Sequence, residues 1–162
     1  MYGNTQKDGE GIYYPVLLTD AAILRSYVWE PELQADELLN DSDKTFVVPA
    51  GEEWIIKSIW VEFTSGAGAV RQMEIQIQDD GADVISQMRA GVTVAAASTQ
   101  YFLFAPHMPD LVALRDTDYT STPIPEWVLP AGYIVRVWDN KAVLPGADDM
   151  IVQLIIGKRP TT

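Results

Sequence analysis

The single histidine and the many carboxylates are the residues with which this chain could carry out acid–base chemistry. His107 stands between two prolines in APHMP, no serine lies in a G-x-S-x-G motif, and nothing in the sequence supports a hydrolase triad. The 23 acidic residues could include a glycosidase-type pair, but their spacing singles out none. We therefore interpret the carboxylates as a solubilising surface, and we expect no catalytic residue and no enzyme.

Two acidic clusters have the oxygen density of calcium-binding loops. They are DDGAD at 79–83 and DSD at 41–43, and neither continues into the twelve-residue EF-hand pattern with its final glutamate. The chain has no cysteine, so a structural zinc site would need the lone histidine and carboxylates. We expect no metal and no cofactor, and we interpret 79–83 as a hairpin turn and 41–43 as a solvated linker.

Large aromatic side chains offer a different chemistry, because they can stack on sugars or fill a protein interface. Trp54 and Trp60 are six residues apart, so on a regular strand they share a face and could form a sugar-binding platform. Aromatic residues also commonly fill cores. The residues that we expect at a contact with a partner are Tyr13, Tyr14, Trp29, Trp54 and Trp60.

Composition limits the partners. The chain has 162 residues, 48% of them hydrophobic, and a formal net charge of −12, which suits one globular domain and repels nucleic acid and anionic membranes. No apolar run approaches the length of a membrane-spanning helix, and residues 1–14 lack the pattern of an export signal. We expect a soluble protein that binds neither nucleic acid nor membrane.

From Asp43 onward, short β-rich runs alternate with Gly, Pro and Asp, a pattern typical of an antiparallel β-sandwich. In QMEIQIQ at 72–78, Met73, Ile75 and Ile77 alternate with polar residues, which predicts a strand with one buried face and one wet face. We expect further strands within 54–63, 95–104, 133–138 and 150–157, and at 83–91 a strand after the turn, with a single helical turn as the alternative. We also expect a long proline-rich connection at 106–125 with an extended piece around 111–114.

The first 45 residues differ in character. Residues 1–14 are polar and glycine-rich, which predicts an extended arm. Apolar spacing in AAILRSYVW at 21–29 predicts a short helix after Asp20, and ELQADELLN at 32–40 predicts a further helical turn. We therefore divide the chain into an arm with a short helix at 1–45 and a β-sandwich at 46–162. The acids between 30 and 53 are interpreted as a solvated face, with contact to a basic partner as the alternative.

One phrase occurs twice, as FVVPAG at 46–51 and WVLPAG at 127–132. Proline suits the second position of a type I turn and glycine accepts a positive φ, so Pro49 with Gly51, and Pro130 with Gly132, predict hairpin loops with a bulge. The flanking sequences do not align, so we interpret the phrases as two turns of one sandwich and not as an internal duplication.

The order of these pieces resembles small virion structural proteins of tailed bacteriophages. The similarity is loose over 46–157 and stronger over 127–157, where LPAG, VWD and ADDM precede a final strand. It implies a jelly-roll β-sandwich that packs on a particle.

Such a protein most simply decorates the capsid as cement, commonly as a homotrimer, and contacts the major capsid protein or another virion protein. Its implied location is the capsid surface, after assembly in the host bacterial cytoplasm. A carbohydrate-binding or host-recognition sandwich, in a tail or neck, is the alternative.

Overall fold

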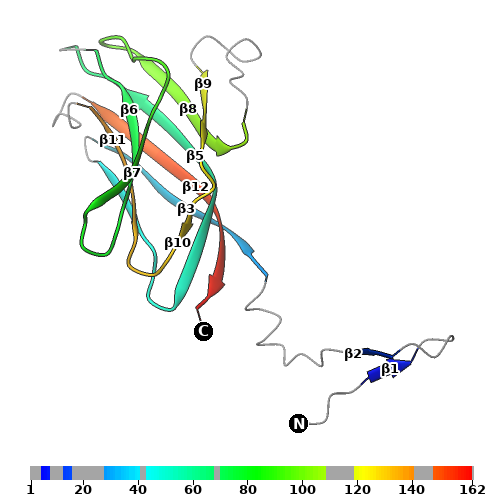
Figure 1. Cartoon of the computed structure of the whole chain (residues 1–162). Helices are drawn as coiled ribbons and strands as arrows, with labels where there is room; N and C mark the ends of the chain where they lie inside the picture. Colours follow the sequence, from blue (N-terminus) through cyan, green and yellow to red (C-terminus); the bar gives the residue numbers. More distant parts are fainter. Residues whose placement is uncertain are drawn as a thin grey trace.

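The computed structural model describes residues 5–7, 13–15, 28–40, 43–67, 70–108, 119–140 and 148–161. Its strands, in chain order, are β1 (Thr5–Lys7), β2 (Tyr13–Pro15), β3 (Glu30–Asn40), β4 (Lys44–Val47), β5 (Glu52–Thr64), β6 (Met73–Gln78), β7 (Val84–Arg89), β8 (Thr99–Pro106), β9 (Tyr119–Ile124), β10 (Val128–Leu129), β11 (Ile134–Asp139) and β12 (Asp149–Pro160) (Figure 1). The described part of the chain contains no helix, and so no helix there could cross a membrane.

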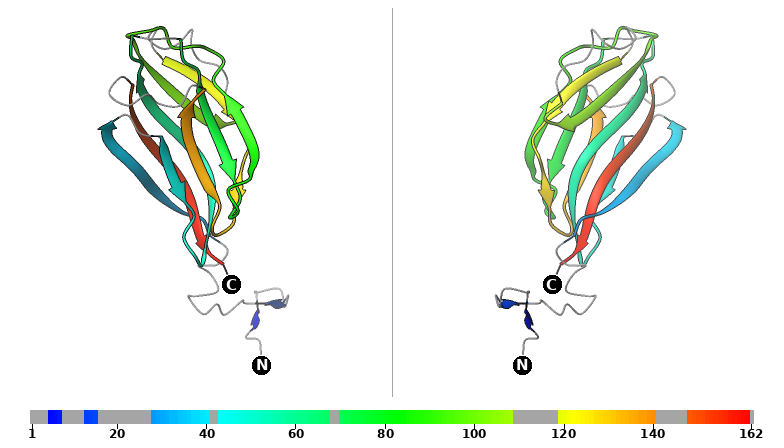
Figure 2. Two further views of the ribbon diagram at one scale, coloured as in Figure 1. Left: turned by 90° about the vertical axis from the view of Figure 1, so that its left-hand side faces the viewer. Right: turned by 90° about the vertical axis from the view of Figure 1, so that its right-hand side faces the viewer.

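Two sheets face each other as a sandwich, which confirms the all-β prediction (Figure 2). The six-stranded sheet has the order β3-β12-β5-β8-β9, and β10 pairs with β5 beside β8. The four-stranded sheet has the order β4-β11-β6-β7. Pairing is antiparallel except between β8 and β9, which run parallel, so the expectation of a wholly antiparallel sandwich was wrong at this edge.

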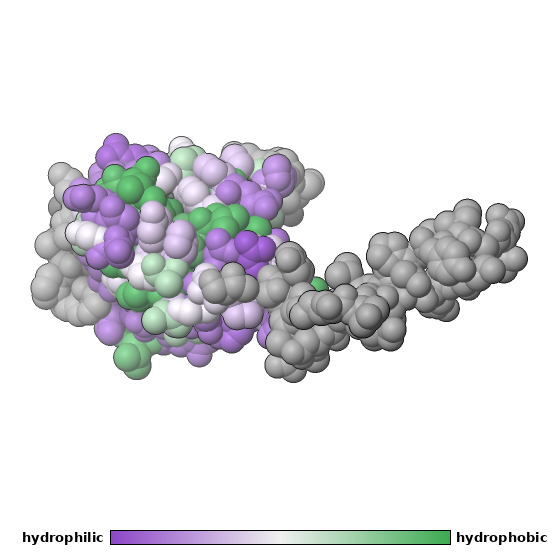
Figure 3. Space-filling view, turned by 60° about the horizontal axis from the view of Figure 1, so that its bottom comes forward, coloured by the Kyte–Doolittle hydropathy of each residue, from purple (hydrophilic) through white to green (hydrophobic). Residues whose placement is uncertain are grey.

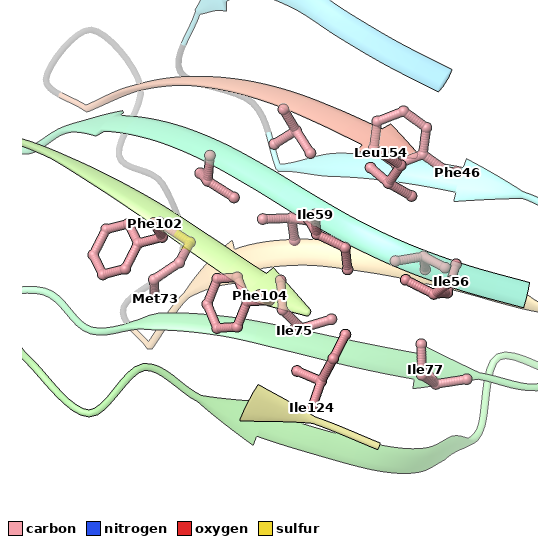
Figure 4. Close-up of a cluster of buried hydrophobic side chains, with 14 of the residues drawn as sticks. Phe46, Ile56, Ile59, Met73, Ile75, Ile77, Phe102, Phe104, Ile124 and Leu154 are labelled. Atoms are coloured by element: carbon pink, nitrogen blue, oxygen red, sulfur yellow. The ribbon is translucent and has the colours of Figure 1, made fainter. Parts of the chain in front are cut away.

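The core lies between the two sheets and is almost entirely apolar. Phe102 and Phe104 from β8 face Met73, Ile75 and Ile77 from β6 across this layer (Figure 4). All five side chains are fully buried. Burial of such aromatic and aliphatic side chains contributes about 1.5–3 kcal/mol each, which makes this layer the main source of stability.

Strand β6 confirms the alternation in QMEIQIQ, but its second face is not wet. Glu74 and Gln76 point away from the core and are nevertheless only 0% and 6% exposed. They lie in register with Arg89 and Gln87 of β7 and with Trp138 and Arg136 of β11, whose longer side chains cover them. Burial on this face comes from neighbouring strands, which a pattern within one strand does not reveal.

The two PAG segments are corners that join the sheets, not hairpins. The first connects β4 in the four-stranded sheet to β5 in the six-stranded sheet, and the second connects β10 back to β11. They run side by side, because β4 pairs with β11 and β5 pairs with β10. The amide of Gly132 donates to the carbonyl of Val48 at 2.9 Å, and the amide of Val48 donates to the carbonyl of Tyr133 at 2.9 Å.

Both corners use the same turn, which differs from the expected one. The amide of Glu52 donates to the Pro49 carbonyl at 3.2 Å, and Tyr133 repeats this bond to Pro130. Proline therefore takes the first position of the turn, not the second. Glycine takes the third position with φ of 80° at Gly51 and 84° at Gly132, as a type II turn requires.

The expected helical turn at 32–40 was wrong, because these residues form β3. Its partner β12 pairs with it from Glu30 to Asn40, and the ladder outweighs the helix propensity of glutamate and leucine. Residues 30–40 thus belong to the six-stranded sheet, although we had assigned them to the arm at 1–45. Most of the expected helix at 21–29 lies outside the described residues.

The connection between β6 and β7 is the predicted turn at 79–83. One oxygen of Asp79 accepts the amides of Gly81 and Asp83, each at 2.9 Å, so this carboxylate serves the turn. Strand β7 confirms the strand expected within 83–91. Strand β9 lies within the expected proline-rich connection, and the piece at 111–114 lies outside the described residues.

Candidate docking surface

The outer face of the six-stranded sheet carries a row of stacked aromatic rings. Trp60 of β5, Tyr101 of β8 and Tyr119 of β9 occupy neighbouring strands. The ring centroids of Tyr101 and Tyr119 are 4.6 Å apart with planes at 16°, and those of Trp60 and Tyr101 are 6.1 Å apart at 25°. All three side chains are half-buried. The stack therefore presents a broad, weakly polar strip to solvent.

Exposed aliphatic residues extend this strip toward the opposite edge of the sheet. Ile155 of β12 is 49% exposed, and Leu33 lies opposite it on β3 and is 57% exposed. Two acidic side chains lie on the same face: Glu62, in register with Tyr101, and Glu37, which accepts a hydrogen bond from Gln153. We define the apolar face as Leu33, Trp60, Tyr101, Leu103, Tyr119 and Ile155. Exposed apolar side chains that gather on one face are typical of an interface. Hydrophobic residues also reach the surface near the corner end of the molecule (Figure 3).

Trp54 and Trp60 do not share a face, contrary to the prediction. The register between β12 and β5 shifts between Ile155 and Ile156, which leaves Lys57 as an extra, exposed residue in β5. A one-residue bulge inverts the alternation. Trp54 is consequently 2% exposed in the core, where its indole nitrogen donates to Glu52 at 2.9 Å. Trp60 alone of the pair is available to a partner.

Trp29 covers the part of the same outer face that lies near the two PAG corners. Its ring lies under Arg159, whose guanidinium carbon is 4.4 Å from the ring centroid. It packs on Gly157 of β12, where an added Cβ would come within 3.1 Å of Trp29 and 2.8 Å of Ile55. The glycine thus provides the space for this tryptophan. Tyr13 and Tyr14 belong to β2, and their side chains lie outside the described part of the chain.

The outer face of the four-stranded sheet carries charged pairs beside exposed aliphatic residues, with Val47 52% and Ile85 54% exposed. The Nε of Arg89 forms an ion pair with Glu74 at 2.6 Å, and the amide of Gln87 donates to the other oxygen of the same carboxylate. Arg136 donates to Asp43 at 2.5 Å and lies 4.5 Å from the ring centroid of Trp138. These contacts pair the charges between strands, although one oxygen each of Glu74 and Asp43 and the indole nitrogen of Trp138 are buried without a hydrogen bond.

The end of the sandwich opposite the PAG corners holds a buried ionic cluster that the sequence did not predict. Arg71 lies 3.3 Å from Asp139 and 3.2 Å from Asp148, and all three are at most 2% exposed. Asp148 also accepts the amide of Gly66 at 2.6 Å. Asp139 ends VWD and Asp148 lies in ADDM, so two motifs of the phage resemblance meet at one arginine. The cluster ties the loops of this end together.

A second buried cation closes one side of the sandwich. Lys44, at the start of β4, is fully buried and donates to Asp36 at 3.0 Å, to Asn40 at 2.7 Å and to the carbonyl of Leu38 at 2.8 Å. Its partners all belong to β3, the edge strand of the other sheet. The lysine thus fixes the edge of one sheet to the edge of the other.

A pocket of about 360 Å³ lies at the first corner, between Gly51, Glu30, Glu52 and the end of β12. Its charges are already paired: Lys158 contacts Glu32, and Arg159 lies 2.5 Å from Glu53. The hydrogen bond with Glu32 raises the pKa of Lys158 above 10.5, against a smaller lowering by desolvation. The pocket therefore offers a ligand no unpaired cation.

The histidine and the carboxylates considered for acid–base or metal chemistry do not come together in one site among the described residues. His107 occupies an exposed turn with φ of 58°, and its Nε2 is 4.0 Å from Glu126. Within the described ranges, no group of three or more His, Asp and Glu residues is arranged to hold a metal ion.

Comparison with known proteins gives limited information. No protein-family profile and no curated protein matches the chain. Solved structures with partial similarity are that of PfGH50B (10% identity, TM-score 0.34, 82% of this chain and 23% of the other), arabinose-bound MgGH51 α-L-arabinofuranosidase (13%, 0.32, 88% and 24%) and infectious bursal disease virus Gx strain (11%, 0.29, 81% and 31%). The chain spans about a quarter to a third of each. At these TM-scores the similarity supports no functional argument, and the chain is described by its own geometry, as an all-β sandwich.

Proposed function

We propose that this chain is a structural virion protein of a tailed bacteriophage, most simply a capsid decoration protein that stabilises the head by non-covalent packing. The observation that carries the proposal is the apolar face of the six-stranded sheet, with Ile155 and Leu33 about half exposed. An exposed face of this kind is stabilised when a partner removes it from water. The resemblance of 127–157 to phage virion proteins supports the choice of partner.

The partner in this proposal is the major capsid protein or another virion protein, and the chain associates with its own copies, most simply as a trimer. Symmetric association covers open sheet edges as well as apolar faces. In this proposal the protein is located on the capsid surface, after assembly in the bacterial cytoplasm. The function requires no catalysis and no cofactor.

A cosedimentation assay tests the proposal. Capsids assembled without this chain are mixed with the purified protein and pelleted, and sedimentation velocity gives the mass of the free protein. We expect saturable binding to the capsids and a discrete oligomer. A monomer that stays in the supernatant would remove the support for a decoration role.

A carbohydrate-binding module is the second candidate, because Trp60, Tyr101 and Tyr119 form an aromatic row. The geometry favours it less. Rings 4.6 Å apart at 16° cover one another's faces, whereas a sugar platform needs a ring face open to the ligand. Titration of tryptophan fluorescence with a panel of saccharides distinguishes the two. A decoration protein shows no change, and a saturable change would favour the carbohydrate-binding module.

A further inference from the structure

Strand β3 is a long open edge of the six-stranded sheet. It runs over 11 residues from Glu30 to Asn40, and among the described strands it pairs only with β12. Figure 2 shows it at the outer margin of the sandwich. An open edge presents a row of backbone donors and acceptors to which another strand can pair. Pro31 and a register shift against β12 between Met150 and Val152 interrupt the edge. The charged residues of β3 are all acidic, so they disfavour an acidic strand and favour a basic one.

The side chains along this edge combine exposed leucines with carboxylates. Leu33, Leu38 and Leu39 are 57%, 71% and 57% exposed. Four acids lie on the same strand, and two of them are paired: Glu32 with Lys158, and Asp36 with Lys44. Glu30 lies opposite Lys158 in the ladder and shares the charge of this lysine with Glu32, and Glu37 accepts a hydrogen bond from the Gln153 amide at 2.6 Å. The edge thus carries apolar surface beside four carboxylates, which outnumber the two lysines, Lys44 and Lys158, that lie near them.

We propose that β3 is a docking edge for an extended, basic segment of a partner protein, which adds to the six-stranded sheet as a further strand. Backbone hydrogen bonds supply the affinity, and side chains on alternate positions supply the selectivity. On the outer face the partner places an apolar residue beside Leu33 and a lysine or arginine beside Glu37. The inference does not require the partner to be a capsid.

Charge argues against a second copy as the occupant. Pairing of β3 with the β3 of another copy brings four carboxylates from each strand to one junction, and only two lysines per copy lie near them. Like charges opposite each other destabilise a strand pair. A basic strand reverses the sign of this interaction and also removes the exposed leucines from water.

The probe is a fluorescein-labelled peptide with the sequence KTTTVTTTK, which places a lysine four residues to either side of a valine on one face of a strand, as Glu37 lies from Leu33. Binding to the full-length protein is followed by fluorescence anisotropy, and hydrogen exchange follows the β3 amides. We expect saturable binding that weakens with salt, with added protection at alternate β3 amides. A peptide with the same charge but four consecutive N-methylated amides should not bind, because it cannot pair at either edge.

A matched pair of variants separates this site from the acidic surface in general. Glu30→Lys with Glu37→Lys should weaken binding about tenfold or more, while Glu126→Lys with Asp80→Lys, which changes the net charge equally, should weaken it by less than about twofold. Equal effects of the two pairs, equal binding of the N-methylated peptide, or no binding would each overturn the proposal. So would β3 amides that are already protected in a dimer of the free protein. The cosedimentation assay is independent of all these results.

Discussion

The outer faces of the two sheets differ in how they treat their side chains. On the four-stranded sheet, Glu74 and Gln76 are buried beneath longer residues, and Glu74 contacts Arg89 and Gln87 of β7. On the six-stranded sheet, half-buried aromatic rings stack between strands and Ile155 is 49% exposed. The first face thus relies on contacts between charged side chains, and the second on contacts between aromatic rings. Under the proposed function, we expect the first face to contribute mainly to stability and the second to association.

Removal of Arg89 should have the largest effect on stability, because Arg89 is the ion-pair partner of the buried Glu74. Arg89→Ala leaves the buried carboxylate of Glu74 with only the Gln87 amide, and the free energy of unfolding should fall by about 2–3 kcal/mol. Urea unfolding measures the change. Lys57→Ala, an exposed lysine on the other sheet, is the control and should change stability by less than about 0.5 kcal/mol. A loss equally small in Arg89→Ala would show that this ion pair does not stabilise the fold.

Gly157→Ala should come next, because it disturbs the part of the outer face of the six-stranded sheet on which Trp29 packs. The new methyl group meets Ile55 at 2.8 Å and Trp29 at 3.1 Å, and we expect a loss of about 1–3 kcal/mol with a change in tryptophan emission. Gly91→Ala, where an added Cβ has nothing within 4 Å, should be close to neutral. Equal stabilities of the two variants would mean that Trp29 does not pack on β12.

The aromatic row should show a smaller, pairwise effect. A double-mutant cycle of Tyr101→Leu and Tyr119→Leu, measured by thermal or urea unfolding, should give a coupling energy of about 0.5–1.5 kcal/mol. Additive losses would contradict the stacked geometry, and would restore the case for rings that lie open to a sugar.

The smallest effect concerns pH at the rim of the corner pocket. The pKa of Lys158 is raised in the fold by its hydrogen bond with Glu32, so the folded state favours the protonated amine. Its stabilising contribution is present below the ordinary lysine pKa and is lost as the pH rises through the higher folded value. The stability gap between the wild type and Lys158→Met should therefore stay constant near neutral pH and close in strong alkali. A gap that does not depend on pH would refute the pairing.

Local signals predicted much of the fold. The alternation of Met73, Ile75 and Ile77 predicted β6, and the PAG phrases predicted turns with glycine at positive φ. Their position between sheets was not predictable, because a turn sequence specifies the local backbone and not the strands that its flanks join. The prediction of helix at 32–40 failed for a related reason: β3 owes its conformation to β12, about 120 residues later in the chain.

The candidate docking surface was harder to predict from the sequence than the fold was. Trp60 was expected at a contact, but its partners in the row were not, because Tyr119 fell in a segment interpreted as a loop. The bulge at Lys57, which removes Trp54 from the surface, has no proline or glycine to mark it. Arg71, Asp139 and Asp148 are far apart in sequence, and only the meeting of their loops brings them together.

The most direct test of the account compares one substitution on each outer face. Ile155→Lys lies on the apolar face, and Ile85→Lys lies on β7 of the four-stranded sheet; the two isoleucines are 49% and 54% exposed. Both variants should unfold at nearly the wild-type urea concentration. In cosedimentation with capsids that lack the protein, Ile85→Lys should bind like the wild type and Ile155→Lys should remain in the supernatant. Equal binding by both folded variants would contradict the assignment of the six-stranded sheet as the docking surface.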